Sequence, residues 1–351
     1  MIVVHEYGHF IQARRLGIRV ERFSLGFGPK LFGWKKGGTE YTLCLFAFGG
    51  FVKMSGDSWE ECKGKPDEFL SRPPLDRLKV IFAGPFLNYV LGFLCFWVVN
   101  VIGYPNLTTN VGELIAGYPA ATSGLAKGDL IASVDGKKVT YWPELTKIVH
   151  SKKTPNLSVE VLRDGKRVNL TVGLRQETAK NIFGSEEKIS LMGIRPSGDV
   201  VLVRYNIFQG FIFAGKMLWE MTVITLIAIG KLLTGSAAVR ESITGPLGMF
   251  FITSEAIRIG VSAVFHLMAI LSASLALFNL LPFPVLDGGH ILFLAIEKLR
   301  GKPLSQKCED AINQSAVALL IGFAVWVFFN DIVRYGFWDK LLGILNKIRW
   351  R

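Results

Sequence analysis

The residues best placed to do chemistry lie within the first ten positions of this sequence, in the segment HEYGH at residues 5–9. Residues four apart share one face of a helix, so the imidazoles of His5 and His9 can bind one zinc ion. Glu6 is placed to take a proton from a water bound to that ion. The simpler interpretation is a chance pattern at the polar end of a helix. Against it, Glu6 is the only charged side chain before Arg14, and a carboxylate in apolar surroundings is costly.

Two histidines leave a tetrahedral zinc ion short of a third protein ligand. Glu21 is the only plausible donor soon after the motif, whereas Asp287 is the only charged residue of a long apolar stretch. Asp287 lies in FNLLPFPVLDGGH, residues 278–290, whose prolines and glycines predict irregular backbone. A bilayer tolerates such backbone only where it is buried in protein or lines a wet cavity. Two alternatives stay open: Asp287 as the N-cap of a helix over 288–299, and His290 as the ligand.

The composition indicates a membrane protein. Of 351 residues 50% are apolar and 19% are charged, against about a quarter charged in a typical soluble protein. The uncharged stretch 80–103 is long enough to cross a bilayer, and further spans are predicted around 267–281 and 317–329. The 26 Phe and 8 Trp exclude disorder. The net charge of +12 is spread over loops without a nucleic-acid-binding pattern, so no nucleic-acid partner is expected.

Together, the two motifs resemble the site-2 protease family of intramembrane zinc metalloproteases, of the bacterial regulator-of-sigma-E type. Three further segments resemble the region after the zinc helix, a membrane-dipping β-hairpin loop and the Gly-Pro-x-x-Asn start of the second span: residues 22–29, 46–54 and 83–88. Ala47 and Phe51 depart from the Pro and Tyr expected in that loop. The resemblance therefore extends along most of the chain.

The resemblance implies a role for particular residues. The implied zinc ligands and general base are His5, His9, Asp287 and Glu6. The implied substrate contacts are Asn279, Pro282, Asn88, Gly49 and Gly50. For Asn279 the alternative is an amide that caps backbone in a broken helix. For Asn88 the alternative is a hydrogen bond between two helices.

We expect a polytopic α-helical membrane protein with about four transmembrane helices, a membrane-associated β-hairpin loop and one extracytoplasmic α+β PDZ domain. The expected parts are an N-terminal membrane part, the PDZ domain with its tail, a membrane-associated amphipathic region, a C-terminal membrane part and a basic tail: residues 1–103, 104–206, 207–262, 263–333 and 334–351. Only four residues precede His5, so the first span is expected to be truncated, with roughly 15 more apolar residues in the natural protein.

The polar middle segment has the pattern of a small α+β domain. Residues 111–115 alternate as in a strand, Asp135-Gly136 is typical of a hairpin, and residues 142–149 have helical spacing. This order resembles the circularly permuted PDZ domains of bacterial proteases. PDZ domains bind an extended peptide along a sheet edge, so a peptide or substrate segment is the expected partner.

Residues 207–233 are apolar enough to suggest another span. Lys216, Glu220 and Lys231 leave too few uncharged residues in a row for a comfortable crossing. We therefore predict an amphipathic helix on the outer leaflet. A further crossing here would also place the Asp287 segment on the wrong side of the membrane.

The expected activity is zinc-dependent hydrolysis of a peptide bond within or near a transmembrane helix, in the bacterial cytoplasmic (inner) membrane. By resemblance, the substrates would be single-span anti-sigma factors already trimmed elsewhere, or remnant signal peptides. The alternatives are a non-catalytic PDZ-bearing scaffold and a metal-handling membrane protein. Glu6 favours the enzyme, because neither alternative needs a general base.

Overall fold

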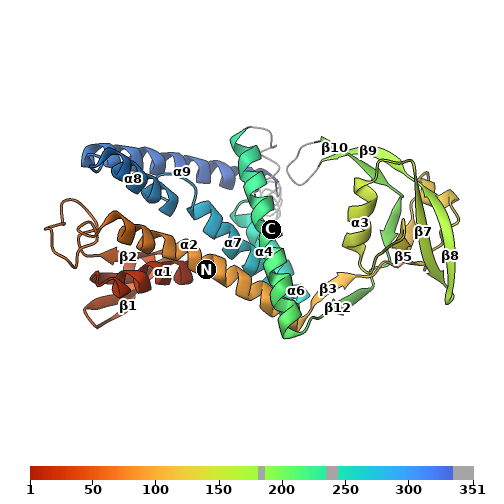
Figure 1. Cartoon of the computed structure of the whole chain (residues 1–351), viewed down its shortest axis with the longest axis horizontal. Coiled ribbons are helices and arrows are strands. Elements are labelled where there is room, and N and C mark those ends of the chain that lie inside the picture. Colours follow the sequence, from red (N-terminus) through yellow and green to blue (C-terminus); the bar gives the residue numbers. More distant parts are fainter. Residues whose placement is uncertain (181–185, 235–243, 335–351) are drawn as a thin grey trace, which may run out of the picture. The chain divides into compact units, whose positions relative to one another are not determined.

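The computed structural model describes residues 1–180, 186–234 and 244–334 (Figure 1). The chain divides into two compact units, which are described separately. The first unit comprises residues 1–99, 211–227 and 244–351, and the second comprises residues 100–210 and 228–243. Almost all of the predicted basic tail, 334–351, lies outside the described residues. The predicted domain boundaries stay predictions.

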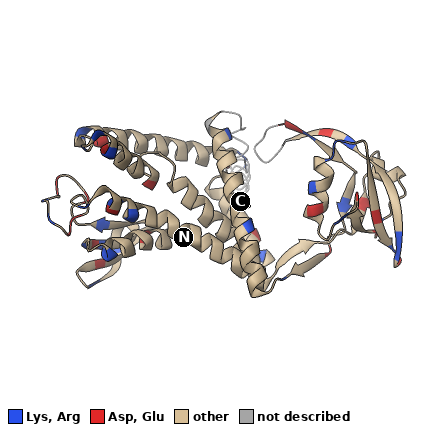
Figure 2. Ribbon diagram, viewed as in Figure 1, with Lys and Arg blue, Asp and Glu red and all other residues tan. Residues whose placement is uncertain are grey.

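Helices dominate the first unit. They are α1 (Ile2–Arg15), α2 (Pro74–Ile102), α4 (Ile207–Leu233, shared with the second unit), α6 (Pro246–Ile259), α7 (Val261–Asn279), α8 (Asp287–Arg300) and α9 (Gln306–Arg334). Among the described residues, four helices are long and apolar enough to cross a membrane: α2, α4, α7 and α9. Charged residues are almost absent along most of α2, α7 and α9 (Figure 2). The span predicted around 317–329 lies within α9, and those predicted around 80–103 and 267–281 extend one and two residues beyond the ends of α2 and α7.

Helix α4 corrects the sequence-based expectation for residues 207–233. The charges do not shorten it: α4 is one unbroken helix of 27 residues, and by length and composition it can cross a membrane. Lys216 and Glu220 are four residues apart and share one side of the helix, and Lys231 lies in the last turn, where a long side chain can reach polar surroundings. Ala214 and Leu218 pack in a core with residues of α2 and α7. The location of α4 on the outer leaflet stays a prediction.

A long β-hairpin follows α1, as predicted for the loop after the zinc helix. It consists of β1 (Val20–Lys36) and β2 (Thr39–Met54). Both strands bend, so residues 22–25 pair with 50–53 on one side and with 40–43 on the other. Gly26 permits the bend, since its φ of +88° is a conformation that other residues rarely adopt. The association of this hairpin with the membrane stays a prediction.

Helix α1 and the hairpin share a core with the start of α2. Phe10 and Ala13 of α1 pack with Val20 and Phe23 of β1 and with Val80 of α2. All five are buried. This core fixes the face of α1 that carries His5 and His9 relative to α2.

The second unit contains a four-stranded sheet of order β6-β5-β7-β8: Lys137–Lys138, Leu130–Val134, Asn156–Arg163 and Lys166–Gly173. Three strand pairs accompany it: β3 (Tyr104–Leu107) with β12 (Val200–Val203), β4 (Val111–Leu114) with β11 (Ile194–Pro196), and β9 (Arg175–Lys180) with β10 (Glu186–Leu191). The helical elements are η1 (Pro119–Thr122) and α3 (Trp142–Ser151). The strand, hairpin and helix predicted at 111–115, 135–136 and 142–149 are confirmed.

An ion pair between a buried carboxylate and a partly exposed arginine lies at the edge of the core of this unit. The Nε and Nη2 atoms of Arg163 each donate to an Asp129 carboxylate oxygen at 2.7 Å, and the Ala126 N–H donates at 2.8 Å. Asp129 is 1% exposed. The bonds from Arg163, aided by the Ala126 N–H, hold the pKa of this carboxyl below its usual range. The ionised form therefore stabilises the fold above about pH 4, and that contribution is lost as the pH falls through the lowered pKa.

We expect Arg163→Met to lower the free energy of unfolding of this unit by about 3 kcal/mol at pH 7, because it leaves a buried carboxylate unpaired. The deficit should shrink as the pH falls below about 4, where Asp129 takes up a proton. Hydrogen exchange of β5 and β7 in urea measures both effects. Arg167→Met is the matched control, since Arg167 is 79% exposed where it pairs with Glu160 and should change stability by under about 1 kcal/mol. Equal effects of the two substitutions would contradict the prediction.

Candidate metal centre

Helix α1 presents His5 and His9 from one face, and α2 orients the second of them. The Nδ1 atom of His9 lies 2.9 Å from the carbonyl oxygen of Val80. A carbonyl oxygen can only accept, so Nδ1 carries the proton and the lone pair of Nε2 faces away from Val80. The two Nε2 atoms of His5 and His9 are 3.3 Å apart. The spacing read from the sequence therefore does bring both imidazoles to one point.

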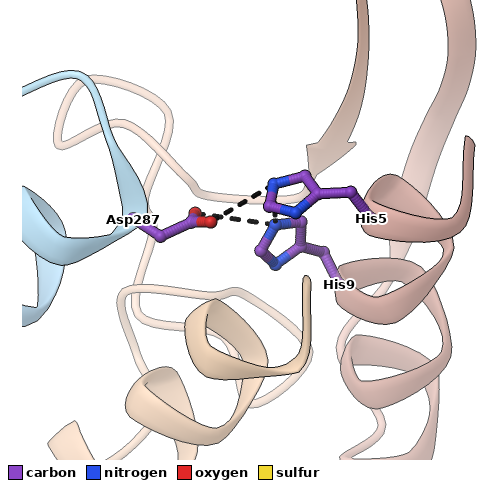
Figure 3. Close-up of side chains that lie close together, drawn as sticks. All are labelled: His5, His9 and Asp287. Atoms are coloured by element: carbon purple, nitrogen blue, oxygen red, sulfur yellow. Dashed lines mark hydrogen bonds and ion pairs between the residues drawn. The ribbon is translucent and has the colours of Figure 1, made fainter. Parts of the chain in front are cut away.

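Asp287 reaches the same point from the start of α8 (Figure 3). Its Oδ2 lies 3.2 Å from Nε2 of His5, and its Oδ1 lies 3.5 Å from Nε2 of His9. The N-cap position belongs to Leu286, without a side-chain capping bond, and Asp287 is the first helical residue. The N-cap interpretation of Asp287 is therefore wrong. Its carboxylate points to the histidines.

The three groups fit a zinc ion. Tetrahedral zinc with ligand distances of 2.0–2.1 Å separates any two ligand atoms by about 3.3–3.4 Å. Here the two Nε2 atoms are 3.3 Å apart, and the nearest Asp287 oxygens are Oδ2, 3.2 Å from His5, and Oδ1, 3.5 Å from His9. Imidazole nitrogens and a carboxylate oxygen are the donor types that zinc takes from proteins. Among the described residues His5, His9 and Asp287 form the group that could hold a metal ion.

The alternative ligands do not join this group. The Glu21 carboxylate pairs with Arg19 at 3.1 Å and is partly exposed to solvent. His290 lies one turn beyond Asp287, with its ring 6.2 Å from that of Phe293, and it is not a member of the metal-binding cluster. The sequence left both residues open as ligands, and the structure places the carboxylate of Asp287 there instead.

A cavity of about 460 Å³ opens onto the centre. The predicted site residues that line it are His5, Glu6, His9, Gly50, Asn279 and Asp287. Gly50 lies directly against the general-base candidate, because a Cβ atom there would be 3.1 Å from Cγ of Glu6. The amide nitrogen of Asn279 lies 3.4 Å from Nε2 of His5. This amide faces the metal ligands rather than capping backbone.

Three predicted substrate contacts lie elsewhere. Gly49 packs against Phe27, whose ring a Cβ atom at residue 49 would overlap. Pro282 lies in the turn between α7 and α8 and is not among the residues that line the cavity. Asn88 is 0% exposed within α2.

Two backbone features that position the ligands were missed by sequence reasoning. Besides the Val80 carbonyl, Gly84 of α2 lies against both imidazoles: a Cβ atom there would overlap Nε2 of His9 and lie 2.9 Å from Cε1 of His5. Gly8 of α1 meets the same turn of α2, since its Cβ atom would overlap the carbonyl oxygen of Ala83. In the sequence, Gly84 stands directly before a proline inside an apolar span, and this unusual pair could have indicated a close backbone contact.

The start of α8 is equally crowded. A Cβ atom on Gly288 or Gly289 would overlap the carbonyl oxygens of Leu281 and Phe283. Val285 has a φ of +76°, a strained conformation for a β-branched residue. The turn between α7 and α8 is thus forced into one shape, which aims Asp287 at the histidines.

Known proteins share these sequence features. The sequence model of Peptidase family M50 matches residues 1–323. Putative zinc metalloprotease Cj1068 of Campylobacter jejuni is 30% identical, over 95% of this chain and 90% of its own length. Metalloprotease MmpA of Caulobacter vibrioides is 30% identical, over 99% of this chain and 96% of its own length. Regulator of sigma-E protease RseP of Escherichia coli is 28% identical, over 95% of this chain and 96% of its own length.

Among solved structures, the PDZ domain of an SdrC-like protein from Listeria monocytogenes is 26% identical in sequence. The match covers 25% of this chain and 84% of that chain, with a TM-score of 0.20. This similarity is too low to support the fold of the second unit, which is described from its own strands and helix.

We expect Gly84→Ala to weaken zinc binding by about 10- to 100-fold, because the added methyl group displaces both imidazoles. Metal analysis of the purified protein after dialysis against graded zinc buffers measures the change. Gly322→Ala in α9 is the matched control, since its methyl group would meet nothing within 4 Å. Equal zinc retention by the two variants would show that α2 does not position the ligands.

Proposed function

We propose a role for each residue of this centre on the premise that the chain belongs to peptidase family M50. It is a zinc metalloprotease of the site-2 protease type. The single observation that carries the proposal is the meeting of His5, His9 and Asp287 in one cluster that could hold a metal ion, with Glu6 in the same cavity but outside the ligand group. Neither a scaffold nor a metal-handling protein needs a free carboxylate there.

In the proposed reaction, Glu6 acts as general base and then as general acid. Bound zinc supplies a Lewis acid, which polarises the scissile carbonyl and lowers the pKa of the attacking water. Glu6 takes one proton from that water while the water oxygen bonds to the carbonyl carbon. Glu6 then returns the proton to the leaving nitrogen as the carbon–nitrogen bond breaks. His5, His9 and Asp287 hold the ion, and the Val80 carbonyl fixes the ring of His9.

The cavity also offers polar groups to a substrate. The amide of Asn279 faces the metal ligands and can donate to the substrate carbonyl. Among the described residues, 50–53 of β2 pair only with 22–25, so the other edge of this strand is open beside Glu6. An unwound substrate segment can add to such an edge by main-chain hydrogen bonds. Contacts from Pro282 and Gly49 stay predictions.

The substrates we propose are transmembrane segments of pre-trimmed anti-sigma factors or remnant signal peptides. Support comes from relatives named as regulators: the sigma-E protease RseP of Escherichia coli and the sigma-W protease RasP of Bacillus subtilis, which is 29% identical. The four apolar helices support a place in the bacterial cytoplasmic membrane. We place the second unit on the extracytoplasmic side.

We propose that the second unit is a PDZ domain that docks a peptide. It has a groove of about 210 Å³ between α3 and the segment 191–194. Trp142, Leu145 and Val149 of α3 line one wall. Apolar walls beside an extended segment suit a peptide side chain, and this favours a substrate segment as the occupant.

We expect Glu6→Gln to retain zinc and to lower the cleavage rate of a model single-span substrate by about 10²- to 10⁴-fold, since it removes the general base. Cleavage in detergent micelles, with zinc measured on the same sample, tests this. Glu255→Gln, at a 61% exposed side chain of α6, is the control and should cleave normally. Unchanged cleavage by Glu6→Gln would overturn the mechanism.

We expect Asp287→Ala to lose zinc at least about tenfold more readily than the wild type, because only two ligands remain. His290→Ala, one turn away, should keep its zinc. Competition with a zinc chelator measures both variants. The reverse order of zinc retention would make His290 the third ligand.

A further inference from the structure

Asn88 is a polar side chain for which neither the fold nor the proposed reaction accounts. It is 0% exposed, and neither Nδ2 nor Oδ1 has a hydrogen-bond partner among the described residues. Its backbone oxygen accepts a bond from Oγ of Ser272 in α7, at 2.8 Å. Unpaired buried amide groups are rare in native proteins, because each one loses its bonds to water and gains none in return. The sequence-based alternative of a side-chain bond between helices is therefore not observed.

The position of Asn88 on α2 links it to the metal centre. Gly84, Asn88 and Gly92 are four residues apart and form one stripe of the helix. Gly84 touches the imidazoles of the metal ligands. At Gly92, a Cβ atom would lie 3.1 Å from the carbonyl oxygen of Ala269 in α7. Asn88 thus lies between the metal centre and the contact of α2 with α7, about 6 Å along the helix from Gly84.

The buried side chains of α7 are all small. They are Ala263, Ala269, Ser272, Ala273 and Ala276. The helix ends at Asn279, whose amide lies 3.4 Å from Nε2 of His5. Small side chains let the backbones of two helices approach closely, so beside Asn88 the contact is made by backbone and small groups. We refer to this contact of α2 with α7 as the α2–α7 seam.

An unwound peptide in a membrane has the polar groups that Asn88 lacks. Its N–H and C=O groups lose their helical partners and must be paired inside the protein. A side-chain amide carries both a donor and an acceptor, so one asparagine can satisfy both groups of a peptide. At 3.2–3.4 Å per extended residue, the distance from Gly84 to Asn88 corresponds to about two substrate residues.

We propose that the α2–α7 seam parts to admit the unwound substrate segment, and that Asn88 hydrogen-bonds to its backbone about two residues from the cleaved bond. This inference depends on the proposed function, since it requires a transmembrane substrate. With the seam closed the amide is unsatisfied, and with substrate bound it is paired. Substrate therefore favours the parted arrangement through a contact that the closed one lacks.

The test measures stability and substrate binding in the same variants. In a Glu6→Gln background, which does not consume the peptide, we expect Asn88→Leu to raise Tm by a few degrees. It removes an unpaired buried amide and keeps a similar volume. We expect its Kd for a labelled single-span peptide in micelles to be about tenfold weaker. A purely structural role for Asn88 predicts the opposite sign for stability, so a lower Tm or an unchanged Kd overturns the inference.

Two further variants keep the result interpretable. Asn88→Ser retains a donor and an acceptor and should bind the peptide within about threefold of the Glu6→Gln parent, even where Asn88→Leu does not fold; weaker binding overturns the inference. Ser272→Ala removes the bond to the backbone oxygen of residue 88, so it should lower Tm without a matching loss of affinity. A matching loss of affinity would assign the effect of Asn88 to packing of the seam.

Failure of the inference and failure of the proposed function look different. If the Glu6→Gln parent does not bind the peptide and the wild type does not cleave it, the proposed function falls, and this inference with it. If the wild type cleaves the peptide and the parent binds it, but Asn88→Leu binds it equally well, only the role of Asn88 is overturned.

Discussion

Three side chains from two helices meet at the centre of this protein, and the rest of the fold must hold them there. The Nε2 atoms of His5 and His9 and the carboxylate oxygens of Asp287 make contacts of 3.2–3.5 Å, which suit ligands of one zinc ion. A metal site needs its ligands kept in place, so the surrounding packing has to resist their separation. The hydrogen bond from His9 to the Val80 carbonyl and the ion pair of Arg77 with Glu297, at 2.5 Å, tie α2 to α1 and to α8.

Backbone contact holds the ligands in place as well as hydrogen bonds do. At Gly84 the backbone of α2 touches the ligand rings, and at Gly288 and Gly289 the first turn of α8 touches the preceding loop. Side chains at these places could change rotamer, whereas direct backbone contact leaves no room for the ligands to move. The strained φ of Val285 indicates that the loop is held by its surroundings rather than by its own preference. Precision at the metal is thus obtained at a local conformational cost.

The sequence predicts what depends on spacing along one element. His5 and His9 share a helix face because they are four residues apart, and the hairpin at Asp135-Gly136 depends on local turn chemistry. The zinc-facing role of Gly84 and the unpaired amide of Asn88 depend on which helices meet, so one segment alone could not reveal them. For α4, the count of uncharged residues predicted a run too short to cross a membrane, whereas the helix is long and apolar enough to do so. The count took no account of Lys216 and Glu220 sharing one side of an otherwise apolar helix.

The distance along the chain between the metal ligands has a consequence for biogenesis. His5 lies in α1, and Asp287 comes after three of the four described helices that can cross a membrane, α2, α4 and α7. Ribosomes add roughly 5–20 residues per second, so tens of seconds separate synthesis of the first ligand from that of the last. During that interval the nascent chain carries two histidines that cannot complete a metal site. The metal site is therefore completed only after α8 has been synthesised and has brought Asp287 to the histidines of α1.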